Sequence, residues 1–551
     1  MTRLDIFTLI LLVLVALSLV RPEFGDRWFS AVERLGARFA HHKRIVVLTT
    51  AVLPILARLA LIPLFGVPLP FFHDEFSYLL AADTFAHGRL TNPPHPMSVF
   101  LETFHVLQHP TYMSIFPPAQ GAVLALGQIL GHPWIGVLLS VALMCGAVTW
   151  MLQGWFPPGW ALLGGLLVPL RLGLAMYWVN SYWGGALAAA GGALVVGALP
   201  RIIHHQRLRD SIWLGIGASL LADSRPLEGL IFCLPVAVGL MIWLFSRSAP
   251  PFRIVGPRIL LPVFCLLALT LLFNGYYNWR ITGNPLIFPH ALFNFQVCNC
   301  PIFAWQKPNP PLHYDNPQFD HFYNVAIRNL YVPTWAGWKH RSIGFVLLLY
   351  QMFLGSILSM SFIMLWRLIR DRRMRLLWLQ FCLSGAGLLA VVYLQPHYAA
   401  PLVATVFALW VQSMRHLRRA KLFGRPVGIG LSRAIILAFV VSLVPFFVKA
   451  ANTLKNRDSW NVSRAHFVNQ LDETSGTHLV IVRYQPDHYV HHAWVYDWVY
   501  NAADIDHSKI VWAREIPGRD IQPLLAYFHD RKVWLVDADA SPPRLRPYSG
   551  Q

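Results

Sequence analysis

The sequence predicts an α-helical polytopic membrane protein that ends in a small α/β domain outside the membrane. Hydrophobic residues make up 56% of the 551 residues and charged residues only 13%, whereas soluble domains are about 45–50% apolar and about 25% charged. Long apolar runs recur up to residue 448, and the basic residues between them are unevenly distributed. This composition excludes an ordinary cytosolic enzyme, a disordered chain and a small secreted module.

The apolar runs define the expected helices, because a spanning helix needs about 20 mostly apolar residues. Reading along the chain gives about 11–13 such helices, with candidates at 4–20, 45–65, 134–152, 158–172, 179–199, 211–222, 227–245, 259–275, 342–366, 376–394, 398–414 and 430–448. The first run is compatible with a signal peptide, but no small-residue cleavage site follows it. We therefore expect residues 1–44 to form an anchor helix and a basic linker.

The basic residues set the expected orientation. Five connections hold 22 of the Lys and Arg residues, namely 21–44, 200–210, 246–258, 367–375 and 415–425. The connections that alternate with them, 66–118, 223–226 and 276–340, hold six. Because cytoplasmic loops carry the excess of Lys and Arg, the first set should face the cytoplasm and the second set the outside. The net charge of +19 is then a signal of orientation in a bilayer, and nucleic acid is not an expected partner.

The chain after the expected transmembrane domain, 45–448, differs from it in composition. Residues 449–551 hold 12 basic and 12 acidic residues. Runs typical of β-strands occur at 479–484, 509–515 and 532–539, with helix-compatible stretches at 464–473 and 519–529 between them. This pattern predicts a small soluble α/β domain on the outer side.

The first candidate site opens the outer loop 66–118. Asp74 and Glu75 stand side by side just after a span, followed by Tyr78 and a helical stretch that Gly88 ends. A carboxylate at the edge of a membrane gains basicity from its low-dielectric surroundings, which suits a general base. The alternative is that Asp74 caps a helix beginning at Glu75.

The second candidate site is the outer turn that contains Arg225, between Asp223 and Glu228. Charged residues wedged between apolar helices are costly and so indicate function. The Arg225 guanidinium can bind a phosphate through two hydrogen bonds. The alternative is an ion pair with Asp223 or Glu228 that closes a tight turn.

Three further features lie on the same outer side. The end of loop 276–340 and the turn after the tenth run carry candidate substrate-binding residues, namely Lys339, His340, Arg341, His397 and Tyr398. For Lys339, His340 and Arg341 the alternative is a cluster of basic side chains that extend to the membrane interface. For His397 and Tyr398 the alternative is a helix-breaking turn with a capping histidine. The spacing of His313, Asp315, Asp320 and His321 allows a metal without specifying one. Cys298 and Cys300 are too close in sequence for an unstrained disulfide, and we assign them no role.

Together these motifs resemble the GT-C superfamily of multi-spanning glycosyltransferases, which includes the protein O-mannosyltransferases, the aminoarabinose transferases and the RgtA/B/C/D-like group. The resemblance covers about residues 45–450. It rests on the acidic pair with Tyr78 and Gly88 in the first outer loop, and on motifs of four later segments: Pro117-Pro118, Arg225-Pro226, the Thr-Gly-Asn-Pro stretch 282–285 and the His-Tyr-Ala-Ala-Pro turn 397–401.

The resemblance implies an inverting transfer of a sugar from a polyprenyl-phosphate donor to an acceptor hydroxyl at the outer face of a bacterial inner membrane. Asp74 would accept the hydroxyl proton, and Glu75 would assist or bind a divalent cation. Arg225 and the cluster Lys339-His340-Arg341 would neutralise the leaving phosphate. The acceptor stays open between a lipid, a glycan and a protein. The rival hypotheses are a flippase or transporter of lipid-linked sugar and a non-catalytic protein of cell-envelope assembly.

Overall fold

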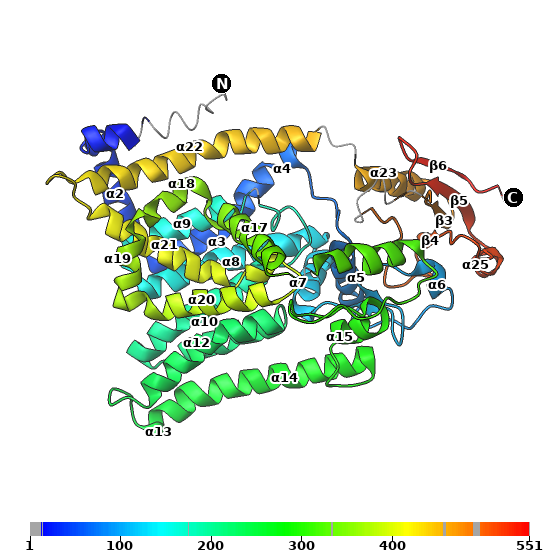
Figure 1. The fold of residues 1–551 in the computed structure, drawn as a ribbon, viewed down its shortest axis with the longest axis horizontal. Helices are drawn as coiled ribbons and strands as arrows, with labels where there is room; N and C mark the ends of the chain where they lie inside the picture. Colours follow the sequence, from blue (N-terminus) through cyan, green and yellow to red (C-terminus); the bar gives the residue numbers. More distant parts are fainter. Residues whose placement is uncertain are drawn as a thin grey trace.

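The computed structural model describes residues 13, 15–174, 176–331, 334–455, 459–486, 488 and 496–549. Most of the expected anchor, 4–20, lies outside these residues. A helix bundle forms the larger part of the molecule, and a small sheet domain lies at one end of it (Figure 1). The expected fold class, a mostly helical chain with apolar helices and a C-terminal α/β domain, is confirmed.

The other expected apolar runs all fall on helices. The bundle consists of α3 (Lys43–Ala60), α4 (Ile62–Phe65), α8 (Pro133–Trp155), α9 (Pro158–Leu172), α10 (Ala186–His205), α11 (Leu208–Ala222), α12 (Pro226–Leu244), α14 (Leu261–Thr282), α17 (Trp335–Phe353), α18 (Gly355–Ser359), α19 (Leu365–Arg370), α20 (Arg375–Ala390), α21 (Leu402–Arg418) and α22 (Val427–Lys455).

Fewer helices than expected are long and apolar enough to cross a membrane. Within the described residues five meet both conditions: α8, α10, α12, the stretch Phe252–Thr282 that ends with α14, and Val427–Pro445 in α22. A sixth would be the pair Trp335–Phe353 and Gly355–Arg370, which is bent by 92°. The expected count of 11–13 is therefore not reached within the described residues, and one expected span, α9, is apolar but has only 15 residues.

The core of the bundle lies around α8, α10 and α21, whose side chains are mostly buried. Helices α10 and α11 approach closely at Gly191 and Gly217, where a Cβ on either residue would lie within 2.9 Å of the other's carbonyl oxygen. Small residues allow such close contact between helices in a membrane. This packing holds α11 and the turn that follows it, which carries Arg225.

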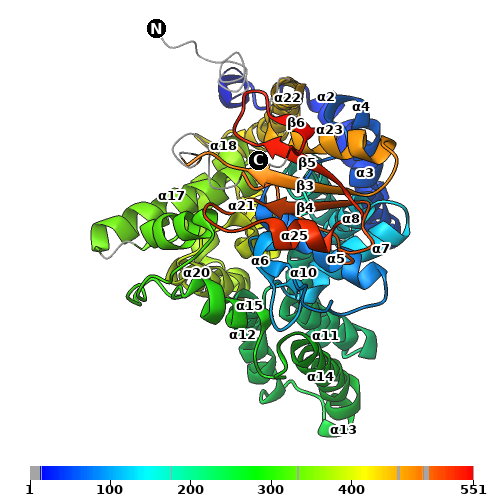
Figure 2. The ribbon, with the colours of Figure 1, turned by 90° about the vertical axis from the view of Figure 1, so that its right-hand side faces the viewer.

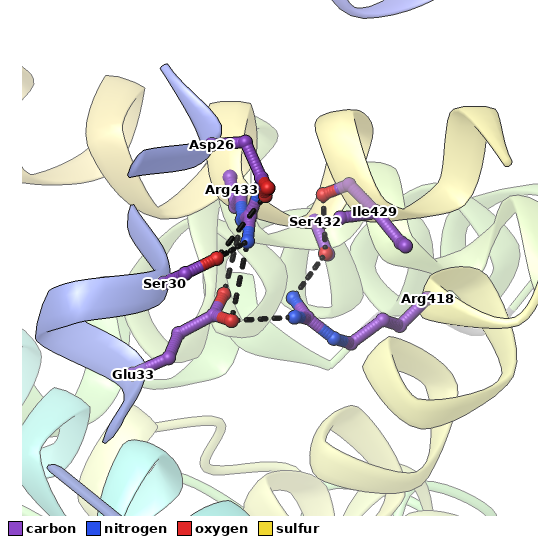
Figure 3. A network of polar contacts seen from close by, with 7 residues as sticks. All are labelled: Asp26, Ser30, Glu33, Arg418, Ile429, Ser432 and Arg433. Atoms are coloured by element: carbon purple, nitrogen blue, oxygen red, sulfur yellow. Dashed lines mark hydrogen bonds and ion pairs between the residues drawn. The ribbon is translucent and has the colours of Figure 1, made fainter. Parts of the chain in front are cut away.

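The expected cytoplasmic connections lie together at one end of the bundle, opposite the sheet domain (Figure 1). One of them, expected as a linker, contains helix α2 (Asp26–Ala40). Figure 3 shows how α2 is attached to the bundle: the Arg433 guanidinium donates to Asp26 at 2.7 Å and to Glu33 at 3.0 Å, and Arg418 donates to Glu33 at 2.8 Å.

The C-terminal domain contains the three expected strands and one more. The sheet has the order β4-β3-β5-β6, in which β3 (His478–Arg483) pairs in parallel with β4 (Ile510–Arg514) and β5 (Lys532–Asp537), while β6 (Arg544–Pro547) is antiparallel to β5. The two expected helices are α23 (Trp460–Glu473) and α25 (Gln522–Tyr527).

The first outer loop forms a layer between the bundle and this domain (Figures 1 and 2). It contains α5 (His73–Ala86), α6 (Ser98–Leu101), the short hairpin of β1 (Val106–Leu107) and β2 (Met113–Ser114), and it ends where α7 (Pro118–Ile129) begins. Helix α5 packs on the bundle with one face and on the sheet domain with the other, where the rings of Phe76 and Tyr500 stack at 3.7 Å.

Candidate functional site

Helix α5 begins at His73, and the two acidic residues that follow have separate environments. Glu75 is buried and accepts hydrogen bonds from the backbone N–H groups of Phe71, Phe72 and Tyr182 at 2.8–3.1 Å. Glu75 therefore caps the helix, the role that the sequence offered to Asp74. Burial raises the pKa of Glu75 to about 7 despite these three donors. Because Glu75 lines neither cavity described below, the structure gives no support to the expectation that it assists catalysis or binds a cation.

Asp74 instead meets two histidines. Its Oδ1 lies 2.6 Å from Nδ1 of His105 and 3.8 Å from Nδ1 of His73, and the two ring nitrogens are 3.0 Å apart. Burial opposes ionisation of Asp74, but the two histidines outweigh it and hold the pKa of the carboxyl well below its usual value. Asp74 is thus ionised at neutral pH and joined to an imidazole.

His105 holds this position through an unusual backbone. Its φ is +58°, a left-handed conformation that is uncommon for residues other than glycine and often found at functional sites. The carbonyl of His105 accepts from Ser77 Oγ at 2.6 Å and from the Ile115 N–H at 3.2 Å, and Ser77 also bonds to Ser114 at 2.8 Å. These contacts from α5 and β2 fix the turn that points His105 at Asp74.

Two adjoining cavities open beside this pair. The larger, of about 540 Å³, is lined by Asp74, both histidines and residues of the loops and of α17. The smaller, of about 280 Å³, lies against the Arg225 turn and the end of α14. The two share a wall made of Ile115, Phe116, His290, Tyr393 and Tyr398. A molecule that bridges the wall would reach both the carboxylate and Arg225.

Arg225 lines the smaller cavity and makes no ion pair among the residues that the structure describes. Its guanidinium lies 4.2 Å from the ring centre of Tyr398. Asp223 instead accepts a hydrogen bond from Asn274 at 2.6 Å, so neither of the ion pairs considered from the sequence forms. Because it is not held in an ion pair of this kind, the guanidinium can bind an anion.

The three basic residues at the start of α17, Lys339, His340 and Arg341, lie in two different environments. Arg341 lines the larger cavity, whereas Lys339 and His340 are exposed and line neither cavity. Lys339 is therefore not placed to neutralise a phosphate in either cavity, because the helix turns this side chain away from the face that Arg341 occupies. Arg341 is thus the member of the cluster that shares a cavity with Asp74.

The aromatic and histidine candidates also differ in where they lie relative to the two cavities. Tyr398 lies in the shared wall, as a substrate-binding residue would. Tyr78 is buried and stacks on Phe116 at 4.4 Å, behind that wall. His397 is 2% exposed, bonds to the Tyr177 hydroxyl at 3.1 Å and packs on Trp183. Tyr78 and His397 line neither cavity, so they support the wall and are not placed to touch a substrate.

Three histidines of the site, His73, His105 and His290, were not identified as site residues from the sequence. His105 stands in a run of apolar residues without any motif, and His290 follows a Phe-Pro pair in the loop after α14. His290 lies in the wall between the cavities, where burial, with His105 and Arg225 nearby, lowers its pKa to about 4. Its position depends on the fold of the loop, so only the tertiary structure could reveal it.

A metal is possible at one place in the described part of the chain. His73, Asp74 and His105 offer three ligand atoms within 4.8 Å of one another. The residues considered from the sequence do not gather: His313 is 92% exposed beside Asp315, and Asp320 bonds to Asn324. Cys298 and Cys300, which were assigned no role from the sequence, form a disulfide with a Cα separation of 5.2 Å. This separation is within the usual range for disulfides.

Comparison with known proteins gives a likeness at the level of architecture. No family model matches the chain, and no curated protein matches it. The chain is similar to the solved structure of ArnT from Cupriavidus metallidurans bound to undecaprenyl phosphate, with 12% identity over 88% of this chain and 92% of that one, at a TM-score of 0.46.

It is also similar to the apo oligosaccharyltransferase of Archaeoglobus fulgidus, with 12% identity over 90% of this chain and 69% of that one, at a TM-score of 0.39. The oligosaccharyltransferase AglB of the same organism in complex with an inhibitory peptide and a dolichol-phosphate gives 11% identity over 90% and 69%, at 0.38. All three identities are 12% or lower, and all three TM-scores are below 0.5.

Proposed function

We propose that this protein is a membrane glycosyltransferase that moves a sugar from a polyprenyl-phosphate donor to an acceptor hydroxyl, with inversion, at the outer face of the membrane. The observation that supports it is an ionised carboxylate on the wall of one cavity and, on the wall of the adjoining one, a guanidinium that forms no ion pair with any described residue. Nucleotide sugars are cytoplasmic, so a transferase at the outer face needs a donor carried by a lipid. This donor class is also the one that the sequence resemblance implies.

The acceptor proton would go to the pair formed by Asp74 and His105. A carboxylate with a lowered pKa is a weak base on its own. When the His105 Nδ1–H donates to Asp74, however, Nε2 of the same ring is left as a proton acceptor, and Asp74 stabilises the imidazolium that forms. His105 lines the larger cavity. We therefore propose the pair as the base, in place of Asp74 alone.

The leaving phosphate would be held by Arg225. In an inverting displacement the incoming oxygen and the leaving oxygen lie on opposite sides of the anomeric carbon. A sugar seated at the shared wall would have the base in one cavity and Arg225 in the other, as this geometry requires. As the bond to the phosphate breaks, negative charge grows on its oxygens, and the guanidinium stabilises it. Tyr398 and His290 would contact the sugar at the wall.

The three groups His73, Asp74 and His105 also fit a divalent metal ion as cofactor. Two imidazoles and a carboxylate are typical ligands of zinc and of other late first-row metals, and they do not suit magnesium, which prefers oxygen. His73, Asp74 and His105 would hold the ion. When bound, it would lower the pKa of an acceptor hydroxyl. Metal analysis of the purified protein decides between a hydrogen-bonded base pair and such a centre.

The deciding experiment is transfer of labelled sugar by the purified protein from short-chain polyprenyl-phosphate donors. We expect turnover by the wild type, a loss of at least about a hundredfold in Asp74→Asn and His105→Gln, and full turnover in the matched variant His109→Gln, which changes an exposed histidine of the same loop that lines neither cavity. Full activity in Asp74→Asn would remove the proposed base. Passage of lipid-linked sugar across vesicles without turnover would instead show a transporter.

A further inference from the structure

Arg341 and Arg225 lie in different cavities, and Arg341 stands at one end of an apolar helix face. Arg341 lines only the larger cavity, and Arg225 only the smaller, with the aromatic wall between them. Of the Arg341 guanidinium, Nη1 donates to the Val392 carbonyl at 2.9 Å, while Nε and Nη2 are buried and have no hydrogen-bond partner among the described residues. A buried donor without a partner costs about 1–3 kcal/mol, so this arginine is suited to receive an anion that the protein does not supply.

The residues below Arg341 on α17 explain what kind of anion fits. Gly344, Phe345 and Leu348 follow at spacings of three, four and seven, so they share one helix face, and all three line the same cavity. The cation thus stands at one end of an apolar stripe on α17, the first helix of the apolar pair that is bent by 92°. A cation above such a stripe matches an amphiphile with an anionic headgroup and a hydrocarbon tail.

We propose that the site binds two separate anionic amphiphiles, one at Arg225 and a second at Arg341 along α17, and that the second is a membrane-anchored acceptor with an anionic group near its reactive hydroxyl. The assignment of the second ligand as acceptor rests on the proposed function, because the Asp74–His105 pair opens into the cavity of Arg341. The alternative is a single phosphate held by both arginines, as the sequence suggested. The aromatic wall between the cavities favours two positions.

The number of bound anions tests this directly. The full-length protein in neutral detergent is titrated with decyl phosphate, and the saturable sites are counted by native mass spectrometry. We expect two sites in the wild type, one in Arg225→Gln and one in Arg341→Gln, with affinity for the lost site reduced at least about tenfold. Lys339→Gln, two residues from Arg341 and outside the cavity, should keep both. A single site in the wild type, or loss of all binding in each variant, overturns the proposal.

Two further measurements separate ligand recognition from misfolding and from the reaction itself. Arg341→Lys should regain part of the second site, and Leu348→Glu should remove that site while the Arg225 site remains, because its carboxylate opposes the tail. Decanol, which lacks the anion, should not compete for either site. Two sites in a protein that transfers no sugar would refute the proposed function alone. One site in an active transferase would refute the second anion alone.

Discussion

A carboxylate oxygen of Asp74 lies 2.6 Å from Nδ1 of His105, although the two residues belong to different parts of the first outer loop. Asp74 stands in the first turn of α5, and His105 lies just before β1 in a left-handed turn. Hydrogen bonds from Ser77 to the His105 carbonyl and to Ser114 join that turn to α5.

The first prediction concerns this turn. Ser77→Ala removes the donor to the His105 carbonyl, and we expect His105 to lose its alignment with Asp74. Turnover should fall about tenfold to a hundredfold with little change in the affinity for decyl phosphate, because a displaced base slows the chemical step. Ser98→Ala, which changes a serine of the same loop whose hydroxyl bonds to His109 and not to His105, serves as the control. Equal turnover in Ser77→Ala and the wild type would show that the turn holds without this bond.

The second prediction concerns the phosphate partner. Arg225→Gln should lower kcat/KM for the donor by about a hundredfold or more, because charge-assisted hydrogen bonds to phosphate contribute about 1.5–3 kcal/mol and strengthen in the transition state. Arg225→Lys should recover only part of this loss, since an ammonium lacks the planar geometry of two parallel donors. Steady-state kinetics with a labelled donor gives the measurement. A lysine variant as active as the wild type would argue against bidentate binding.

The third prediction concerns Glu102, whose side chain is mostly buried beside Phe104 in the outer loop. Burial raises the pKa of Glu102 to about 7, although Arg514 and Asn316 act against it. A carboxyl whose pKa is higher in the folded protein stabilises the fold below the pKa of the unfolded chain, near 4.5, and this stability is lost as the pH rises through 7. The loss should be of the order of 1–3 kcal/mol between pH 5 and pH 8.

Thermal unfolding at these two pH values tests the sign. The wild type should be less stable at pH 8 than at pH 5, and Glu102→Gln, which cannot ionise, should reduce the difference. Glu473→Gln, on the exposed end of α23, gives a comparison in which a carboxyl is removed without burial. A pH dependence that is the same in Glu102→Gln and the wild type would exclude Glu102 as its source.

The fourth prediction concerns the contact between the C-terminal domain and α5. Phe76 and Tyr500 stack at 3.7 Å with their rings 4° from parallel, and Arg464 lies 5.3 Å from the Phe76 ring. Tyr500→Ala should lower the free energy of unfolding by about 3–5 kcal/mol and reduce turnover, because α5 carries Asp74. Tyr500→Phe should be close to the wild type, since the hydroxyl of Tyr500 is buried without a hydrogen-bond partner in the described structure.

The fifth prediction concerns the opposite end of the bundle, where Arg433 joins α2 to α22 (Figure 3). The Arg433 side chain is 7% exposed, while Asp26 and Glu33 are 58% and 40% exposed, so solvent screens much of the attraction. Arg433→Gln should therefore cost only about 1–2 kcal/mol in the free energy of unfolding. Sugar transfer by the folded fraction should be unchanged, and a specific loss of turnover would reveal coupling between the two ends.

Parts of the site could be predicted from the sequence because they depend on local chemistry. The acidic pair, Arg225 and Arg341 stand out as charges among apolar residues, and a charge in that setting is costly without a role. The sequence could not separate Asp74 from Glu75, because their different roles arise from distant partners. Tyr182 donates its N–H to Glu75 from the segment before α10, while His105 reaches Asp74 from the hairpin.

The roles of the basic cluster on α17 and of the two cysteines could not be predicted from the sequence for the same reason. Lys339 and Arg341 are equivalent as a basic cluster, and the rotation of α17 decides that only Arg341 enters the cavity. Similarly, the disulfide between Cys298 and Cys300 depends on the π-helical turn at Asn294–Cys298 and the left-handed Asn299 that follows it. Spacing along the chain could not reveal that backbone geometry.

The amino-acid sequence by itself determined the helical character of the chain, the two ends of the bundle and the C-terminal α/β domain. Hydrophobic transfer energy and charge placement act residue by residue, so they can be read without knowing any contact. The tertiary structure decided which polar groups meet: the Asp74–His105 pair, the capping role of Glu75 and the two cavities on either side of Tyr398. These depend on hydrogen bonds and packing between segments far apart in the chain, which no local pattern encodes.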